Sequence, residues 1–295
     1  MGPLTLFAPA KINPVLEVLG KRPDGYHELS LIFQTIGLYD FLTFEASGEG
    51  IRLEIPGAPP ELANDEGNLV LKAARLFQKK YPAPERGARI TLEKKIPIAA
   101  GLGGGSSDAA ATLLGLDALF RTRLGMKALQ EMAAELGSDV PFFLHGGTAL
   151  GTGRGEKITS LPPMPELHLV LVKPPKGLST PAVYQSGKAR FTNGEMTKRF
   201  LGLVGERNPA YLTGSLYNGL EPATFFLMPE VETIKRQLLE AGALAALVSG
   251  SGPTVFGIAP SEGQAREIAA KMGKNGNPVW VTTTVPAGSN RPWRI

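Results

Sequence analysis

The chain has 295 residues, so two packed domains are expected, and its 43% hydrophobic and 20% charged residues are typical of a globular protein. It contains no cysteine, which excludes disulfide scaffolds, Cys-ligated zinc and thiol nucleophiles. Its net charge of +4 comes from dispersed Lys and Arg residues rather than from the basic stripe that a nucleic-acid interface needs. The N-terminus lacks a signal-peptide pattern and no apolar run is long enough to span a membrane, so we expect a cytoplasmic protein that binds neither membranes nor nucleic acid.

Short β-like runs dominate the first third of the chain, and turn residues separate them. They cover residues 4–7, 15–19, 29–36, 41–46, 51–55 and 90–93. Asn68 is placed to cap a helix that runs to about residue 80, because Leu69, Ala73, Leu76 and Phe77 have the spacing of one apolar helix face.

The rest of the chain alternates helices and strands without a strict βαβ order. A helix ending near residue 120 should be capped by Ser106, Ser107 or Asp108, and a helix over 127–136 should end at Gly137. The turn-rich segment 160–165 is the candidate linker. Beyond it we expect strands at 167–172, 246–249, 255–259 and 279–284, and helices at 197–204, 229–242 and 264–271. These elements predict an α+β fold with domains over 1–159 and 160–295.

The segment PIAAGLGGGSSDAAA, residues 97–111, is the strongest functional signal. A strand leads into consecutive glycines, two hydroxyls and a helix, so successive backbone N–H groups and the helix N-terminus would form a phosphate-binding loop. It matches neither of two better-known phosphate loops. Ser106 occupies the position of the lysine in the P-loop pattern G-x-x-x-x-G-K-[ST], and the position of the third glycine in the Rossmann pattern G-x-G-x-x-G. The alternative is a glycine-rich turn with no ligand.

Two further segments carry candidate catalytic and binding residues. In residues 7–33, Lys11 lies beside Asn13, and Tyr26 and His27 follow a turn where an aromatic ring could stack on a base or a sugar. Asp139 follows a helix and precedes an apolar run, as a general base at the floor of a cleft would. Each has a simpler alternative: a surface lysine, local packing, or a turn carboxylate.

A late loop, SGSGPTVFG at residues 249–257, connects two strands and is a weak signal by itself. The sequence does not support a Ser-His-Asp hydrolase, because the three histidines are scattered and no G-x-S-x-G segment occurs.

Together these segments resemble the GHMP kinase superfamily over essentially the full length. The most specific parts are APAKIN at 8–13, PDGYHEL at 23–29, GLGGGSSDAA at 101–110 and GSDVPFF at 137–143. The resemblance implies a ribosomal protein S5 domain 2-like N-terminal domain, an α/β-sandwich C-terminal domain, and ATP and Mg²⁺ as cofactors. The most similar members phosphorylate a hydroxyl of a cytidine diphosphate-linked polyol, so the implied partners are small molecules.

The resemblance also implies roles for individual residues. Asp139 would be the base that takes the proton of the acceptor hydroxyl, and Lys11 would keep that carboxylate ionised. The implied ATP-binding residues are Asn68, Lys94, Pro97, Gly101, Leu102, Gly103, Gly104, Gly105, Ser106 and Ser107. The implied acceptor-binding residues are Asn13, Tyr26, His27, Thr180 and Tyr184, with Tyr26 and Tyr184 on the two faces of the pyrimidine. The metal ligands are not readable, although Ser107 is a candidate.

Two other functions remain open from the sequence. One is a sister kinase that acts on mevalonate, homoserine or a sugar, against which the aromatic pair in PDGYHEL argues. The other is a nucleotide-binding regulator without activity, which would need neither Lys11 nor Asp139. The oligomeric state and the role of residues 186–215 are not indicated.

Overall fold

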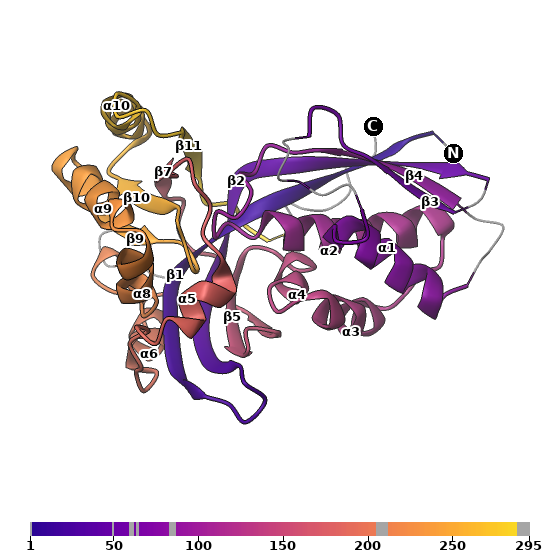
Figure 1. Ribbon diagram of the computed structural model, residues 1–295, viewed down its shortest axis with the longest axis horizontal. Coiled ribbons are helices and arrows are strands. Elements are labelled where there is room, and N and C mark those ends of the chain that lie inside the picture. Colours follow the sequence, from indigo (N-terminus) through magenta and orange to yellow (C-terminus); the bar gives the residue numbers. More distant parts are fainter. Residues whose placement is uncertain are drawn as a thin grey trace.

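The structure, a computed structural model, describes residues 2–48, 50–58, 62, 65–82, 87–204 and 212–287. Its strands form two sheets, and helices cover a face of each (Figure 1). The mixed α+β class predicted from the sequence is confirmed.

The first sheet is built around two long antiparallel strands, β1 and β2, in the order β3-β4-β2-β1-β8, with β5 and β6 branching from β2. Its strands are β1 (Leu4–Lys21), β2 (His27–Ser47), β3 (Ile51–Glu54), β4 (Gly87–Glu93), β5 (Thr148–Gly153), β6 (Lys157–Ser160) and β8 (Tyr217–Asn218).

Each long strand unites two runs that the sequence suggested as separate strands. In β1, Pro9 and Pro14 interrupt the apolar pattern, and neither can donate a backbone hydrogen bond to the ladder. The β1–β2 register shifts between Pro9 and Ala10, and again between Ile12 and Val15. Such bulges let the strand continue past proline. Lys11 thereby lies in the middle of a strand rather than at its end.

Four helices pack on one face of this sheet: α1 (Leu69–Lys80), α2 (Gly104–Phe120), α3 (Met126–Leu136) and α4 (Val140–Phe143). The predicted cap of α1 is confirmed, since Asn68 Oδ1 accepts from the Val70 N–H at 2.9 Å. The predicted side-chain cap of α2 is wrong. Gly103, in the left-handed region at φ 70°, occupies the cap position with no side-chain hydrogen bond. Its conformation lets the helix begin within the glycine run, so the two serines lie in the first turn.

The second sheet is antiparallel, in the order β11-β7-β10-β9. Its strands are β7 (His168–Val172), β9 (Ala245–Val248), β10 (Val255–Ala259) and β11 (Val279–Thr283), and α9 (Glu230–Glu240) and α10 (Glu262–Gly273) pack on it. Among the described residues, three short helices lie between β7 and α9 in the sequence: α5 (Thr180–Gln185), α6 (Glu195–Leu201) and α8 (Glu221–Leu227). Neither α5 nor α8 was predicted.

The two parts of the chain share interactions at several places. A buried cluster joins Ala10, Ile12 and Ile36 of the first sheet to residues of β7, β9 and β10. β8 extends the first sheet by pairing parallel to β1, and the Val285 N–H donates to the Thr35 carbonyl of β2 at 3.0 Å. The domain limits expected at residues 159 and 160 stay a prediction.

Candidate active site

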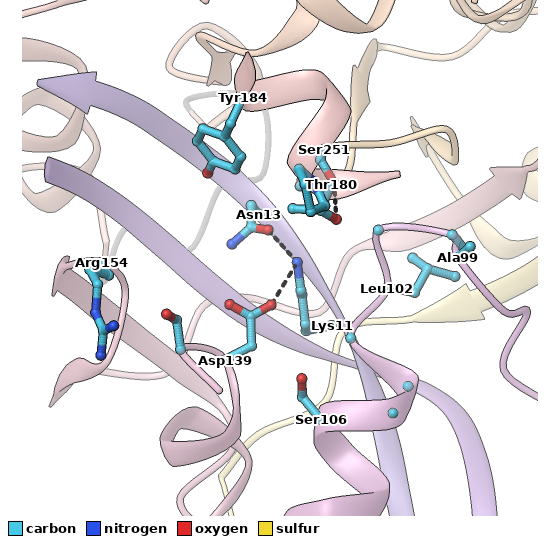
Figure 2. Close-up of a pocket in the computed structure, with 18 of the residues that line it drawn as sticks. Lys11, Asn13, Ala99, Leu102, Ser106, Asp139, Arg154, Thr180, Tyr184 and Ser251 are labelled. Carbon is cyan, nitrogen blue, oxygen red and sulfur yellow. Dashed lines mark hydrogen bonds and ion pairs between the residues drawn. The ribbon is translucent and has the colours of Figure 1, made fainter. Parts of the chain in front are cut away.

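A cleft of about 1320 Å³ lies where β1, the glycine loop, α4, α5 and the late loop meet. Of the candidate residues, all but Ser107 line it. Figure 2 labels several of them, including Lys11, Asp139 and Tyr184. Segments as distant in the chain as Lys11, Asp139 and Ser251 therefore face one cavity.

The glycine loop is held by contacts with both parts of the chain. The Lys11 N–H donates to the Leu102 carbonyl at 2.9 Å, and the Ser249 hydroxyl donates to the Gly101 carbonyl at 3.0 Å. A Cβ on Gly103 would lie 2.7 Å from the Phe143 ring and 3.1 Å from Lys11 Cγ. Gly103 is thus required by the packing of the protein itself, beyond any need to admit phosphates.

Lys11 and Asp139 form the charged centre of the cleft. The Lys11 ammonium lies 3.5 Å from Asp139 Oδ2 and donates to Asn13 Oδ1 at 2.6 Å. The side chain of Lys11 is 4% exposed and that of Asp139 is 35% exposed, so the carboxylate is the partner that a ligand can reach. Burial lowers the pKa of Lys11, and the nearby Asp139 carboxylate opposes that shift.

Asn13 connects this pair to the sheet, because its amide donates to the Ile32 carbonyl of β2 at 3.1 Å. The carbonyl oxygen of the amide is consequently aimed at Lys11. The ammonium is held from one side by Asn13 and from the other by Asp139, so its direction is fixed before any ligand enters.

A second buried charge cluster lies beside the glycine-loop end of the cleft. Lys94 bridges Asp40 and Asp108, with an Nζ–Oδ2 distance of 2.7 Å to Asp108. Asp40 also accepts from the backbone N–H groups of Lys95 and Ile96 at 2.6 and 2.8 Å. Burial raises the pKa of Asp108 to about 8, while the charge of Lys94 opposes the rise.

Two buried polar atoms near the start of α2 lack a partner among the described residues. The buried Ser107 hydroxyl and Asp108 Oδ1 have no hydrogen bond with any described residue. Within the same ranges, no group of three or more His, Asp or Glu side chains is placed to hold a metal ion by itself. This donor set suits a magnesium ion that arrives with nucleotide phosphates, since Mg²⁺ usually takes only one or two protein ligands.

The opposite end of the cleft is aromatic. The rings of His27 and Tyr184 lie 5.1 Å apart between centroids, and Phe191 lies 6.1 Å from His27 on a nearly parallel plane. Burial raises the pKa of Tyr184, and the charge of Asp139 adds to the rise. Tyr26 is exposed, and its ring lies against Arg154.

Thr180 lies near this end at the start of α5. Its hydroxyl is hydrogen-bonded to that of Ser251 in the late loop at 2.8 Å. The late loop, a weak sequence signal, thereby helps to position a candidate acceptor-binding residue.

Two residues that line the cleft, Asp108 and Arg154, were given no role in the site from the sequence, and neither was Asp40 beneath it. Asp108 was considered only as a helix cap, and Asp40 and Arg154 belong to no segment whose chemistry could be read by itself. The nearest signal was the density of glycines around Arg154, which marks a constrained turn.

The fold and the cleft define a class of small-molecule kinases. The models of the GHMP kinases N-terminal and C-terminal domains match residues 68–147 and 206–278. The chain belongs to the GHMP kinase family.

Within that family, the chain is similar to 4-diphosphocytidyl-2-C-methyl-D-erythritol kinases. It is 49% identical to the one from Moorella thermoacetica, over 97% of this chain and 100% of the relative. It is 46% identical to that of Pelotomaculum thermopropionicum, over 95% and 98%. A crystal structure of 4-(cytidine 5'-diphospho)-2C-methyl-D-erythritol kinase superposes with a TM-score of 0.78 at 34% identity, covering 95% of this chain and 99% of that one.

The chain also shares its fold with homoserine kinase from Cytophaga hutchinsonii. The two structures superpose with a TM-score of 0.79 at 21% identity, covering 99% of this chain and 98% of that one.

None of the helices in the described part of the chain is long and apolar enough to cross a membrane.

Proposed function

We propose that the chain uses ATP to phosphorylate the 2-hydroxyl of 4-diphosphocytidyl-2-C-methyl-D-erythritol, giving the 2-phosphate and ADP in non-mevalonate isoprenoid biosynthesis. The observation that carries this proposal is the pair of Lys11 and Asp139, 3.5 Å apart, beside a glycine loop that opens a helix. Relatives of nearly equal length that are 46–49% identical carry the corresponding name.

Asp139 is the base in this proposal. Its carboxylate is the more exposed member of the pair and accepts the proton of the acceptor hydroxyl as that oxygen attacks the terminal phosphorus of ATP. Lys11 lies 3.5 Å from Asp139 and is placed to neutralise charge that develops on the transferred group. Its burial strengthens this interaction, because water screens it less.

The start of α2 binds the phosphates. The first N–H groups of a helix lack intrahelical acceptors, and the helix dipole adds about half a positive charge at this end. Gly103 at the cap position leaves these groups uncovered by a side chain. Mg²⁺ would supply charge neutralisation between the phosphates. Ser107 is the candidate protein ligand suggested by the sequence; its hydroxyl has no partner among the described residues, but it is buried and does not line the cleft.

The aromatic end of the cleft binds the cytosine. His27 and Tyr184 present ring faces and nitrogen or oxygen atoms there, which suits a base and gives no advantage to a short polar acceptor. Tyr26 contributes from the hairpin tip. Asn13 and Thr180 contact the polar groups of the acceptor.

A coupled assay of ADP release across candidate acceptors tests the function. We expect turnover with the cytidylylated methylerythritol and poor turnover with methylerythritol phosphate, mevalonate and homoserine. If methylerythritol phosphate or mevalonate were phosphorylated as efficiently, the cytosine site would be wrong. If no acceptor released ADP above the ATPase background while ATP still bound, a nucleotide-binding regulator would be the better description.

A further inference from the structure

A cation at the acceptor end of the cleft has no role in the mechanism above. Arg154 follows β5, and Figure 2 shows its side chain on the side of Asp139 away from Lys11. We propose that Arg154 binds the diphosphate of a nucleoside diphosphate-linked acceptor and thereby selects acceptors that carry this group. This inference rests on the function proposed above and extends it to a specificity-determining residue.

The backbone around Arg154 is constrained. Gly153 and Gly155 have positive φ angles of 73° and 105°, and the Arg154 N–H donates to Glu156 Oε2 at 2.7 Å. A side chain at either glycine would be strained in this conformation. The turn therefore presents Arg154 in one direction, toward the cleft.

The guanidinium group of Arg154 lies over an aromatic ring. Its central carbon is 4.8 Å from the centroid of the Tyr26 ring. A cation–π contact of this kind uses none of the five N–H donors of the guanidinium, which form a planar fork. Those donors match two phosphate oxygens in a bidentate arrangement.

The charges nearby leave Arg154 available for an anion. Arg22 pairs with Asp24 at 3.1 Å and with Glu28 at 2.5 Å, so both acidic residues of the hairpin already have a cation. Across the described ranges, the Arg154 guanidinium forms no ion pair with a carboxylate. A half-buried cation at the wall of a cleft gains by binding a ligand of opposite charge.

The position of Arg154 fits the chemical order of the acceptor. Tyr26, which it contacts, belongs to the base end, and Asp139 belongs to the hydroxyl that reacts. In a nucleoside diphosphate-linked polyol the two phosphates lie between these ends. Mevalonate and homoserine offer no diphosphate at this point, so Arg154 would discriminate against them.

Lys21 is the rival for this role, because it also lines the cleft at this end. Its side chain is exposed and no ring stacks on it among the described residues, whereas Arg154 lies over Tyr26. The two cations are distinguished by separate substitutions to glutamine.

The test compares the binding of CDP and of cytidine to the full chain by calorimetry. The ratio of their Kd values isolates the diphosphate, because both contain the same base and ribose. We expect the wild type to bind CDP at least about tenfold more tightly, and Arg154→Gln to remove about tenfold of that preference. Arg154→Lys should recover part of it, since it keeps the charge and loses the planar fork.

The matched control is Lys157→Gln, which removes an exposed charge three residues away and outside the cleft. It should leave the ratio, the KM for ATP and the acceptor kinetics unchanged. Arg154→Gln should raise the acceptor KM with an unchanged KM for ATP, and thermal denaturation should show that both variants are folded.

The proposal is overturned if Arg154→Gln keeps the full preference for CDP, or if only Lys21→Gln removes it. Either result would leave the kinase activity of the wild type, and hence the proposed function, untouched. Conversely, a wild type that preferred CDP through Arg154 but phosphorylated no cytidylylated acceptor would retain the diphosphate site and refute the proposed function.

Discussion

Replacing Gly103 by alanine should damage both stability and catalysis through contacts inside the protein. The added Cβ would lie 2.7 Å from Phe143 Cζ, closer than real Cβ contacts, and 3.1 Å from Lys11 Cγ. Phe143 is 2% exposed and has little room to move. A non-glycine residue in the left-handed region costs about 1–2 kcal/mol, and overpacking of a core costs about 1–3 kcal/mol. We therefore expect a loss of about 2–5 kcal/mol in the free energy of unfolding.

The matched variant is Gly105→Ala, two residues further into the same loop. Its Cβ would meet only Leu69 Cδ1 at 3.4 Å, and its φ is not positive. Because it lies in the first turn of α2, alanine there should be neutral or stabilise the helix by up to about 1 kcal/mol. Urea unfolding of both variants measures the difference directly.

The catalytic effect of Gly103→Ala should exceed what the stability loss explains. Displacing the Lys11 side chain by a fraction of an ångström moves the ammonium relative to Asp139, and misplacements of about 1 Å can cost about 10²-fold in rate. Steady-state assays of folded protein should show a lower kcat. A Gly103→Ala variant as stable and as active as Gly105→Ala would refute this packing account of the loop.

Three further predictions concern single side chains. Asp139→Asn should lower kcat by about 10² to 10⁴ while ATP binding stays within a few-fold, and retention of more than a tenth of the wild-type kcat would exclude Asp139 as the base. Tyr184→Ala should raise the acceptor KM about tenfold and Tyr184→Phe should change it little, because the ring face stacks on the base; equal effects of the two variants would contradict stacking. Asp108 has a folded-state pKa raised by burial from 3.8 to about 8, so its contribution to stability is full below pH 3.8 and is lost as the pH rises through about 8. Asp108→Asn should accordingly gain stability relative to wild type between pH 4 and pH 8 in denaturant titrations, and a constant difference would show that Asp108 is ionised throughout.

The sequence correctly predicted several helix ends, because these depend on residues that are close together in the chain. The cap at Asn68 and the end of α3 at Gly137 are confirmed, because each depends on a few neighbouring backbone groups. The sequence did not predict the strand β5, because its packing depends on a residue far away in the chain. A Cβ on its Gly151 would lie 2.7 Å from the Phe33 ring of β2, so this glycine admits a side chain from another strand. No pattern within residues 146–155 contains that information.

The residues of the candidate site also fall into two groups, those that the sequence indicated and those that only the tertiary fold brings together. The glycine loop and the Lys11 and Asp139 residues were recognisable because their segments resemble those of the family, and the structure brings them to one cleft. The buried partners of Lys94 depend on which side chains the tertiary fold brings beneath the loop. The expected arrangement of Tyr26 and Tyr184 about one base stays a prediction; Tyr184 contacts His27, and Tyr26 contacts Arg154.

The pairing of β8 with β1 has a consequence for the modularity of the chain. Gly219 donates to the Leu16 carbonyl at 2.8 Å, and Thr192 donates to the Val18 carbonyl at 3.0 Å, so residues from the later part protect the edge of β1. Leu16 and Val18 are almost fully buried. An N-terminal fragment ending near residue 159 would expose unpaired backbone groups beside apolar side chains, an arrangement that favours edge-to-edge association. The two parts are thus poorly suited to independent exchange between proteins, although each contains its own sheet.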